Sequence, residues 1–265
     1  MTPTRIKLVI AYDGTNYAGW QVQQSGTGVQ EVIEGAFAKL FNIPFRIYSS
    51  SRTDAGVHAI GMVAHVDVPL GKFKMTDRKL GLALNAHLPP DIRVFESKQV
   101  AASFHARFNA SGKQYRYFVW NHPAHHPLLH RQIWHVPQPL LLQSMKHAAR
   151  DFLGKHDFAS FAATRDYKMN STVRTVTRCD IRRSGYMFTF IIEGDGFLYK
   201  MCRGIVGTLV QVGQGKIEPA AIPKMLHQKD RKAAGMSAPA AGLVLWKVFY
   251  KRSATGKIMD GTEDE

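Results

Sequence analysis

The sequence predicts an α+β protein made of two ferredoxin-like (RRM-like) halves that share an extended antiparallel sheet, with helices packed on it. Two observations predict this fold class. Strand-like segments alternate with segments of helical periodicity, and the order β-α-β-β-α-β occurs twice along the chain. The halves are expected at residues 1–105 and 106–250, and the polar segment 251–265 is expected to be a disordered tail.

The first half contains four strand-like and two helix-like segments. Apolar residues of its first helix recur at helical spacing, at Val29, Ile33 and Phe37. Thr76 suits the N-cap of the second helix, because its hydroxyl accepts from a free backbone amide. In chain order the expected elements are strand 6–12, helix 29–40, strands 45–49 and 62–68, helix 76–87 and strand 92–98.

The second half repeats this order with one extra helix. Gly154 and Gly213 are expected to end its two longer helices, and residues 183–185 are expected to form the turn of a hairpin. In chain order the expected elements are strand 114–121, helix 140–153, strands 173–182 and 186–193, helices 197–212 and 220–228, and strand 243–250.

The charge of the chain points to a polyanionic partner. The 265 residues include 35 Lys and Arg against 20 Asp and Glu, which gives a formal net charge of +15 and a sequence pI of about 9.9. Such a basic chain favours nucleic acid, and a solvated basic surface is the alternative. No apolar run reaches the roughly 20 residues of a membrane span. Cys179 and Cys202 do not form a disulfide framework, so a reduced, cytoplasmic protein is expected.

Three strings contain residues that could carry chemistry. The first, SRTDAGVHA at residues 51–59, places a cation, a carboxylate and an imidazole in a short loop between two strands. Its alternative interpretation is a polar turn held by an Asp side chain. A Ser-His-Asp triad is not expected, because the three groups lie too close in one loop for triad geometry.

The other two strings lie in the second half. KQYRY at 113–117 places Tyr115 and Tyr117 on one face of a strand and Arg116 on the other, which suits base stacking or a half-buried sheet equally. GFLYKMCRGIVG at 196–207 places Arg203 on a helix, where it pairs with a carboxylate or is solvated. Its two glycines, Gly204 and Gly207, weaken a helix and indicate close packing.

Metal and nucleotide-cofactor sites are not indicated. Five histidines gather at residues 122–135, but no Cys or carboxylate completes a ligand set there. The sequence has neither a phosphate-binding P-loop nor a G-x-G-x-x-G motif after a strand.

An ordered set of strings over nearly the whole chain, from about residue 6 to 250, resembles the TruA family of tRNA pseudouridine synthases, which act at positions 38 to 40 of tRNA. The strings are AYDG at 11–14, Tyr17, GWQ at 19–21, RTDAGVH at 52–58, Asn85 with Leu88 and Pro89, FHARF at 104–108, YRY at 115–117, HDF at 156–158, SF at 160–161, GFLY at 196–199, Met201, Arg203, IVG at 205–207 and GL at 242–243. The resemblance implies the pseudouridine synthase fold and a cofactor-independent isomerase. It also implies a homodimer that clamps one tRNA.

Site residues follow from the resemblance. Asp54 matches the catalytic aspartate, and Arg52 matches an arginine that helps to expel the target base. Tyr115 matches the tyrosine that stacks on the flipped uracil, and Arg203 matches the arginine that pairs with the aspartate. Leu245 or Leu243 lines the pocket.

The chain departs from the family pattern at three positions. Ser51 stands where glycine is expected, Gly204 where asparagine is usual, and Cys202 where valine is common. None of these touches the three matched catalytic positions, so activity is still expected.

Two other classes of function compete with this interpretation. A noncatalytic RNA-binding protein would share the charge and the aromatic strands, but a carboxylate facing phosphates would weaken its binding. A metal-dependent nuclease would need clustered carboxylates, and only single ones occur. Phosphate contacts are expected from basic residues outside the loop, with the candidates Lys72, Lys74, Arg78, Arg165, Lys168 and Arg174.

Overall fold

The computed structural model describes residues 3–24, 26–69, 75–163 and 171–251. The chain forms two compact units, of which the first contains Met1–Ser111 and Leu245–Glu265 and the second contains Gly112–Val244. The two units are defined by which residues pack together. The halves 1–105 and 106–250 are instead defined by the repeated order of strands and helices, and they stay a prediction. The expected tail lies outside the described residues from residue 252 onward.

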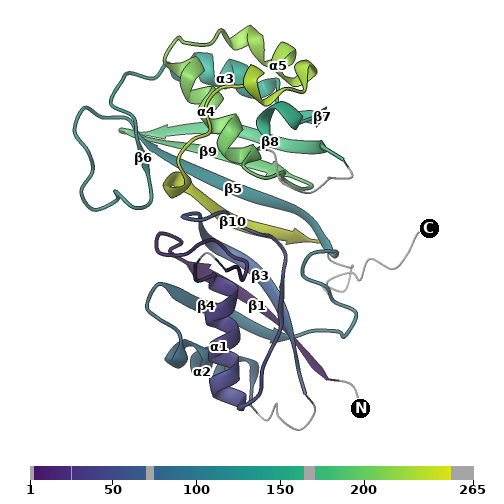
Figure 1. Cartoon of the computed structure of the whole chain (residues 1–265). Helices are drawn as coiled ribbons and strands as arrows, with labels where there is room; N and C mark the ends of the chain where they lie inside the picture. Colours follow the sequence, from purple (N-terminus) through teal and green to yellow (C-terminus); the bar gives the residue numbers. More distant parts are fainter. Residues whose placement is uncertain (1–2, 25, 70–74, 164–170, 252–265) are drawn as a thin grey trace. The chain divides into compact units, whose positions relative to one another are not determined.

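The first unit is built on an antiparallel sheet covered on one face by helices α1 (Val29–Phe41) and α2 (Asp77–His87) (Figure 1). Alternate β1 residues, among them Ile6 and Leu8, are completely buried, as expected for a strand with one packed face. In order across the sheet, the strands are β4 (Ile92–Gln99), β1 (Thr4–Tyr12), β3 (His58–Val68) and β10 (Leu243–Tyr250), with β2 (Ile47–Ser49) also paired to β3.

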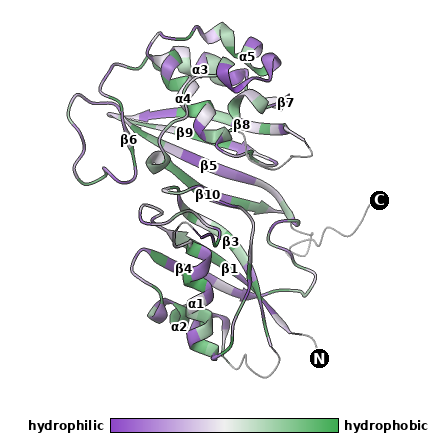
Figure 2. Ribbon diagram, in the orientation of Figure 1, coloured by the Kyte–Doolittle hydropathy of each residue, from purple (hydrophilic) through white to green (hydrophobic). Residues whose placement is uncertain are grey.

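The strands of the second unit are covered by helices on one face (Figure 1). Its strands are β5 (Ala110–Trp120), β9 (Met187–Gly194), β8 (Val173–Ser184) and β7 (Gly154–Asp157), paired antiparallel in this order. The short strand β6 (Trp134–His135) runs parallel to β5 and so departs from the antiparallel prediction. Figure 2 shows β10 mostly hydrophobic and the middle of β5 hydrophilic, which matches their sequences.

The helices of the second unit are α3 (Leu142–Arg150), α4 (Met201–Gly213) and α5 (Ile222–Gln228). Short 3-10 turns lie between the larger elements, and they are η1 (Ala159–Phe161), η2 (Pro219–Ala221), η3 (Arg231–Ala233) and η4 (Ala240–Gly242). The α+β class predicted from the sequence is confirmed.

Two helix boundaries differ from the prediction. Helix α3 ends at Arg150, and Gly154, expected as its stop, is the first residue of β7, with φ +99 and Val176 of β8 as its pairing partner. Helix α4 begins at Met201, four residues later than expected, because Lys200 has a left-handed backbone with φ +60. Phe197 therefore precedes the helix and packs elsewhere.

Candidate functional site

The loop that carries Asp54 connects β2 to β3 in the first unit and is tied to the segment that follows β1. The amide of Trp20 donates to the carbonyl of Thr53 at 3.1 Å. The hydroxyls of Tyr12 and Thr53 share a buried hydrogen bond 2.8 Å long. Burial raises the pKa of Tyr12, so this hydroxyl keeps its proton. The carbonyl and the hydroxyl of Thr53, the residue directly before Asp54, are thus both fixed by hydrogen bonds.

Glycines allow this loop to lie against its neighbours. Gly19 has φ +101, and a Cβ there would stand 2.6 Å from the carbonyl oxygen of Thr53. Gly56 has φ +74, and its amide donates to the carbonyl of Tyr17 at 3.3 Å. A side chain at either position would meet backbone strain, and at Gly19 also a clash. The glycines therefore set the path of the loop around Asp54.

Histidine 58 holds the opposite end of the loop. His58 is buried, and its Nδ1 lies 3.0 Å from the amide nitrogen of Gly14, from which it accepts. The same Nδ1 is 3.1 Å from an Asp13 carboxylate oxygen. These contacts make His58 an anchor between β3 and the turn after β1.

The loop's remaining polar side chains differ in exposure. Arg52 is exposed and Asp54 is half-buried, so both lie where a substrate can meet them. Ser51 is buried, and its hydroxyl has no hydrogen-bond partner among the residues that the structure describes. The departure from glycine at this position therefore adds an unsatisfied polar group to the loop.

In the second unit, Tyr115 lies in β5 on the face that packs against the helices. Its side chain is almost wholly buried, and the ring of Phe197 meets it edge-on, with centroids 5.1 Å apart and planes at 81°. Tyr117 is buried beside it in the strand, and its hydroxyl donates to the carbonyl of Pro239 at 2.8 Å. Both tyrosines lie on one face of β5, as predicted, and their contacts with Phe197 and Pro239 hold them in position.

Arg203 is fixed at the start of α4 by a two-way contact with a distant segment. Its Nε donates to the carbonyl of Ala238 at 2.7 Å, and the amide of Ala238 donates back to the carbonyl of Arg203 at 2.9 Å. Arg203 is half-buried, so its side chain is partly shielded from solvent. Two glycines make room for this packing. A Cβ on Gly207 would lie 1.9 Å from the carbonyl oxygen of Met236, and one on Gly204 would lie 2.5 Å from that of Phe161.

The last predicted pocket residue lies in β10. Leu245 is completely buried, whereas Leu243 is slightly exposed. Asp54, Arg52 and Leu245 belong to the first unit, and Tyr115 and Arg203 belong to the second. Their convergence in one catalytic site is part of the proposal below.

Of the predicted phosphate contacts, four lie outside the described residues: Lys72, Lys74, Arg165 and Lys168. Arg78 is exposed on α2, in a position open to solvent. Arg174 donates to the carbonyls of Ser171 and Val173, so part of its hydrogen-bonding capacity is used locally.

The histidine-rich segment 122–135 is held by ring and backbone contacts. The rings of His125 and His135 meet edge-on at 4.9 Å, and His135 Nε2 lies 2.7 Å from the carbonyl oxygen of His122. Over the part of the chain that is described, no group of three or more His, Cys, Asp and Glu side chains could hold a metal ion. Nor does any described helix combine the length and apolarity needed to cross a membrane.

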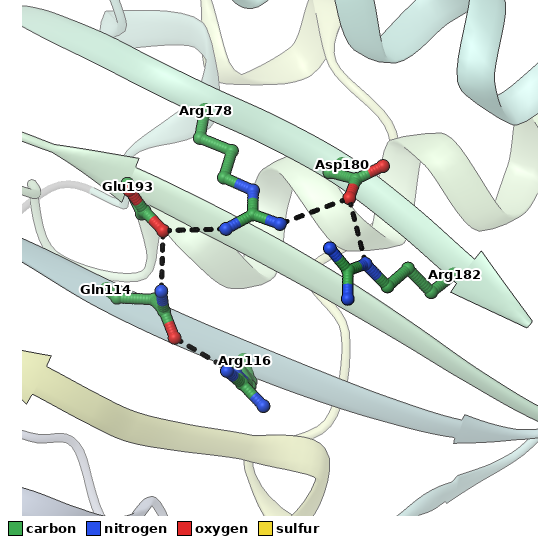
Figure 3. A network of polar contacts seen from close by, with 6 residues as sticks. All are labelled: Gln114, Arg116, Arg178, Asp180, Arg182 and Glu193. Atoms are coloured by element: carbon green, nitrogen blue, oxygen red, sulfur yellow. Dashed lines mark hydrogen bonds and ion pairs between the residues drawn. The ribbon is translucent and has the colours of Figure 1, made fainter.

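The sequence prediction missed a charged network on the open face of the second unit's sheet. Figure 3 shows its six side chains in front of the strands, with helical ribbon behind them. Arg178 bridges Glu193 at 3.1 Å and Asp180 at 3.3 Å, and Asp180 also contacts Arg182 at 3.2 Å. Gln114 and Arg116 of β5 extend the network from Glu193.

This network covers an apolar residue. Ile191 pairs directly with both Arg116 and Asp180 across the sheet, so it shares their face, yet it is only 2% exposed. Long arginine side chains bury apolar surface beneath their stems. The charged residues at alternate positions 178, 180 and 182 are the sequence signal that could have predicted this network.

Comparison with known proteins gives one family. The family model described as tRNA pseudouridine synthase matches residues 8–109 and 148–251. A tRNA pseudouridine synthase A of Geobacter sulfurreducens is 46% identical over 250 residues, which cover 92% of this chain and 99% of the relative. One of Acetivibrio thermocellus is 44% identical over 245 residues, with 92% and 99% covered.

A tRNA pseudouridine synthase A of Exiguobacterium is 42% identical over 248 residues, which cover 94% of this chain and 98% of the relative. A solved Cbf5-Nop10-Gar1 complex aligns over 94% of this chain and 58% of its own at 12% identity, with a TM-score of 0.33. That score supports no argument, whereas the family model and the relatives span both units. The chain therefore belongs to the tRNA pseudouridine synthase family.

Proposed function

We propose that this protein converts uridine to pseudouridine at positions 38, 39 and 40, in the anticodon stem and loop of tRNA. The observation that carries the proposal is the geometry of the loop 50–57 between β2 and β3, which we call the RTD loop. Thr53 is held there at both its hydroxyl and its carbonyl, while Asp54 is half-buried and Arg52 is exposed. Relatives more than 40% identical over nearly their whole length are named for the same activity.

The reaction is an isomerisation that balances without a second substrate. The bond between uracil N1 and ribose C1′ breaks, the base rotates, and a bond between C5 and C1′ forms. The proton on C5 is released, and N1 gains a proton from solvent. Because no atom or electron is added overall, we propose that the enzyme uses no cofactor.

Asp54 is the proposed catalytic carboxylate, whether it attacks the base, attacks the sugar or removes a sugar proton. We propose that Arg203 pairs with it and keeps it ionised, since a nearby cation favours the charged form. The clamp between Arg203 and Ala238 supports this role, because it fixes the guanidinium before substrate binds.

The target base must leave the helical stack to be reached, which costs a few kcal/mol. We propose that Arg52 helps to expel it and that Tyr115 stacks on the flipped uracil, which returns about 1–3 kcal/mol. Leu245 of β10 is the proposed apolar wall of the pocket.

We also propose that two copies of the chain act together as a homodimer on one tRNA, in the reducing cytoplasm. Cys179 and Cys202, both among the described residues, form no disulfide, in line with such a compartment. The net charge of +15 supports binding that draws on phosphate contacts and weakens steeply with salt.

The test is tritium release from a tRNA transcript labelled at uracil C5. Each new C5–C1′ bond expels one tritium into water, so the proposal predicts release. Transcripts in which uridine is replaced at 38, 39 or 40 assign the positions. Tight, salt-sensitive binding without release from any competent transcript would instead indicate a noncatalytic RNA-binding protein.

A further inference from the structure

A second cluster in the first unit has the composition of an RNA-binding surface. Tyr48 is 49% exposed and Phe108 is 74% exposed, although both are large aromatic side chains. The ring of His105 joins them, 6.2 Å from Tyr48 and 4.2 Å from Phe108. The guanidinium of Arg107 lies 5.7 Å from the Phe108 centroid. We call these four residues the aromatic–arginine patch.

The patch is held in place from below by a buried residue, His65. The buried ring of His65 stacks on Tyr48 at 5.2 Å and 22°, and contacts His105 at 4.7 Å. Its Nδ1 accepts from the amide of Ala106 at 3.2 Å, which fixes the segment beside the patch. An aromatic surface held in this way loses little conformational freedom when a ligand binds.

Two further contacts hold the segment that carries Phe108. The Nδ1 of His105 accepts from the amides of Arg107 at 3.1 Å and Phe108 at 3.3 Å. Arg5 donates to the carbonyl of Phe104 at 2.8 Å and pairs with Asp67 at 2.7 Å. The carboxylate beside the cluster is therefore neutralised, while Arg107 is exposed and available.

The patch lies apart from the end of the RTD loop that joins β3, although the loop begins just after β2, which carries Tyr48. Tyr48 pairs with His65, which follows His58 by seven residues along β3. At about 3.3 Å per residue, that places the patch roughly 20 Å from the strand end that holds the loop. A nucleotide on the patch is therefore not the target nucleotide.

We propose that the aromatic–arginine patch binds an unpaired base of the tRNA substrate by stacking, with Arg107 on the adjoining phosphate. The ligand class follows from the chemistry: exposed aromatic faces accept any base, and a neighbouring cation pairs with its phosphate. Arg107 is exposed beside the rings, so the patch favours an anionic occupant. The proposal rests on the proposed function, since it assigns a second contact for the same RNA.

The test measures binding of an unmodified tRNA transcript to wild type and to Phe108→Ala and Tyr48→Ala. Each loss of a stacking ring is expected to weaken binding about five- to hundredfold. Turnover at saturating tRNA stays at the wild-type rate, because the patch lies far from Asp54. Phe95→Ala is the matched control: Phe95 is 64% exposed on β4 of the same unit and is expected to bind like wild type.

Two further variants separate stacking from a merely structural role. Phe108→Trp keeps an aromatic face and is expected to bind tRNA as tightly as wild type. Arg107→Ala is expected to reduce the slope of log affinity against log salt by about 1, whereas Phe108→Ala leaves the slope unchanged. Sedimentation of all variants reports their assembly.

Binding by Phe108→Ala and Tyr48→Ala equal to that by Phe95→Ala would overturn the proposal, and so would an altered assembly state with tRNA affinity unchanged. The proposed function fails separately, if wild type releases no tritium. In that event, loss of tRNA binding by Phe108→Ala would still support the patch.

Discussion

In the first unit, side chains help to fix the loop around Asp54: the hydroxyls of Tyr12 and Thr53 share a hydrogen bond, and His58 accepts from the turn after β1, in addition to the backbone hydrogen bond from Trp20 to Thr53. In the second unit, Arg203 is fixed by main-chain groups of Ala238: its side-chain Nε donates to the carbonyl of Ala238, and its own carbonyl accepts from the amide of Ala238. Glycines make the close approach possible in both places. A hydroxyl can be removed without a steric clash, whereas closely packed backbone cannot accept a larger residue. The two places should therefore respond differently to mutation.

The largest effect on stability is expected where backbone meets backbone. In Gly207→Ala the new Cβ would stand 1.9 Å from the carbonyl oxygen of Met236, so the segment that clamps Arg203 must shift. We expect a loss of about 3 kcal/mol or more from the free energy of unfolding, measured in urea, with reduced turnover. Gly35→Ala is the control: nothing lies within 4 Å of its Cβ, so it should stabilise α1 by about 0.5–1 kcal/mol. Equal effects at the two positions would show that the clamp does not depend on close packing.

A pH-dependent effect on stability is expected in the first unit, from the buried His65 of β3. Burial lowers the pKa of His65 to about 4, below its value of about 6.5 in the unfolded chain. Between these values the unfolded chain binds a proton that the folded chain does not, so stability falls as pH falls. We expect this histidine to cost about 2 kcal/mol at pH 5 relative to pH 7.5.

Urea unfolding of wild type and His65→Gln at both pH values measures this cost. Other groups titrate over the same range, so the difference between the two proteins isolates the histidine. The same pH dependence in both would contradict the assignment to His65.

A smaller effect is expected from the hydroxyl pair beside Asp54. Tyr12→Phe leaves the buried hydroxyl of Thr53 without its partner, which costs about 1–3 kcal/mol of unfolding free energy. Because the loop keeps its backbone hydrogen bonds, we expect turnover to fall several-fold and tRNA binding to persist. Unchanged turnover would show that the backbone contacts alone position Asp54.

The smallest effect is expected from Ser51, in the same loop as Asp54. Ser51→Ala removes a buried hydroxyl that lacks a partner among the described residues, so it should leave stability unchanged or raise it by up to about 1 kcal/mol. Thermal unfolding measures the change. A clear loss of stability would show that the hydroxyl is satisfied in solution by water.

Periodicity and turn residues predicted most of the fold. They located β1, β10, the hairpin of β8 and β9, and the buried face of α1, because these elements carry a local pattern. They failed at Gly154 and at Lys200, where backbone conformations set by neighbouring segments override local preference. The two-residue strand β6 has too few residues to produce a pattern.

The candidate site shows the same division. Resemblance proposed Asp54 and Arg203, and the alternation of β5 placed Tyr115. The clamp on Arg203 could not be predicted, because its partner Ala238 lies 35 residues along the chain. Close packing at Gly204 was predicted, but its packing partner was not, since only the fold shows that a larger residue there would meet the backbone of Phe161.

The most direct test of the account is the turnover of Asp54→Asn, measured by tritium release from C5-labelled tRNA beside wild type. The account predicts no release above background and tRNA affinity within about threefold of wild type, because the variant removes only the carboxylate charge. Asp151→Asn, at the end of α3, is the control and should retain wild-type turnover. Release by Asp54→Asn at a rate near that of wild type would contradict the assignment of Asp54 as the catalytic residue.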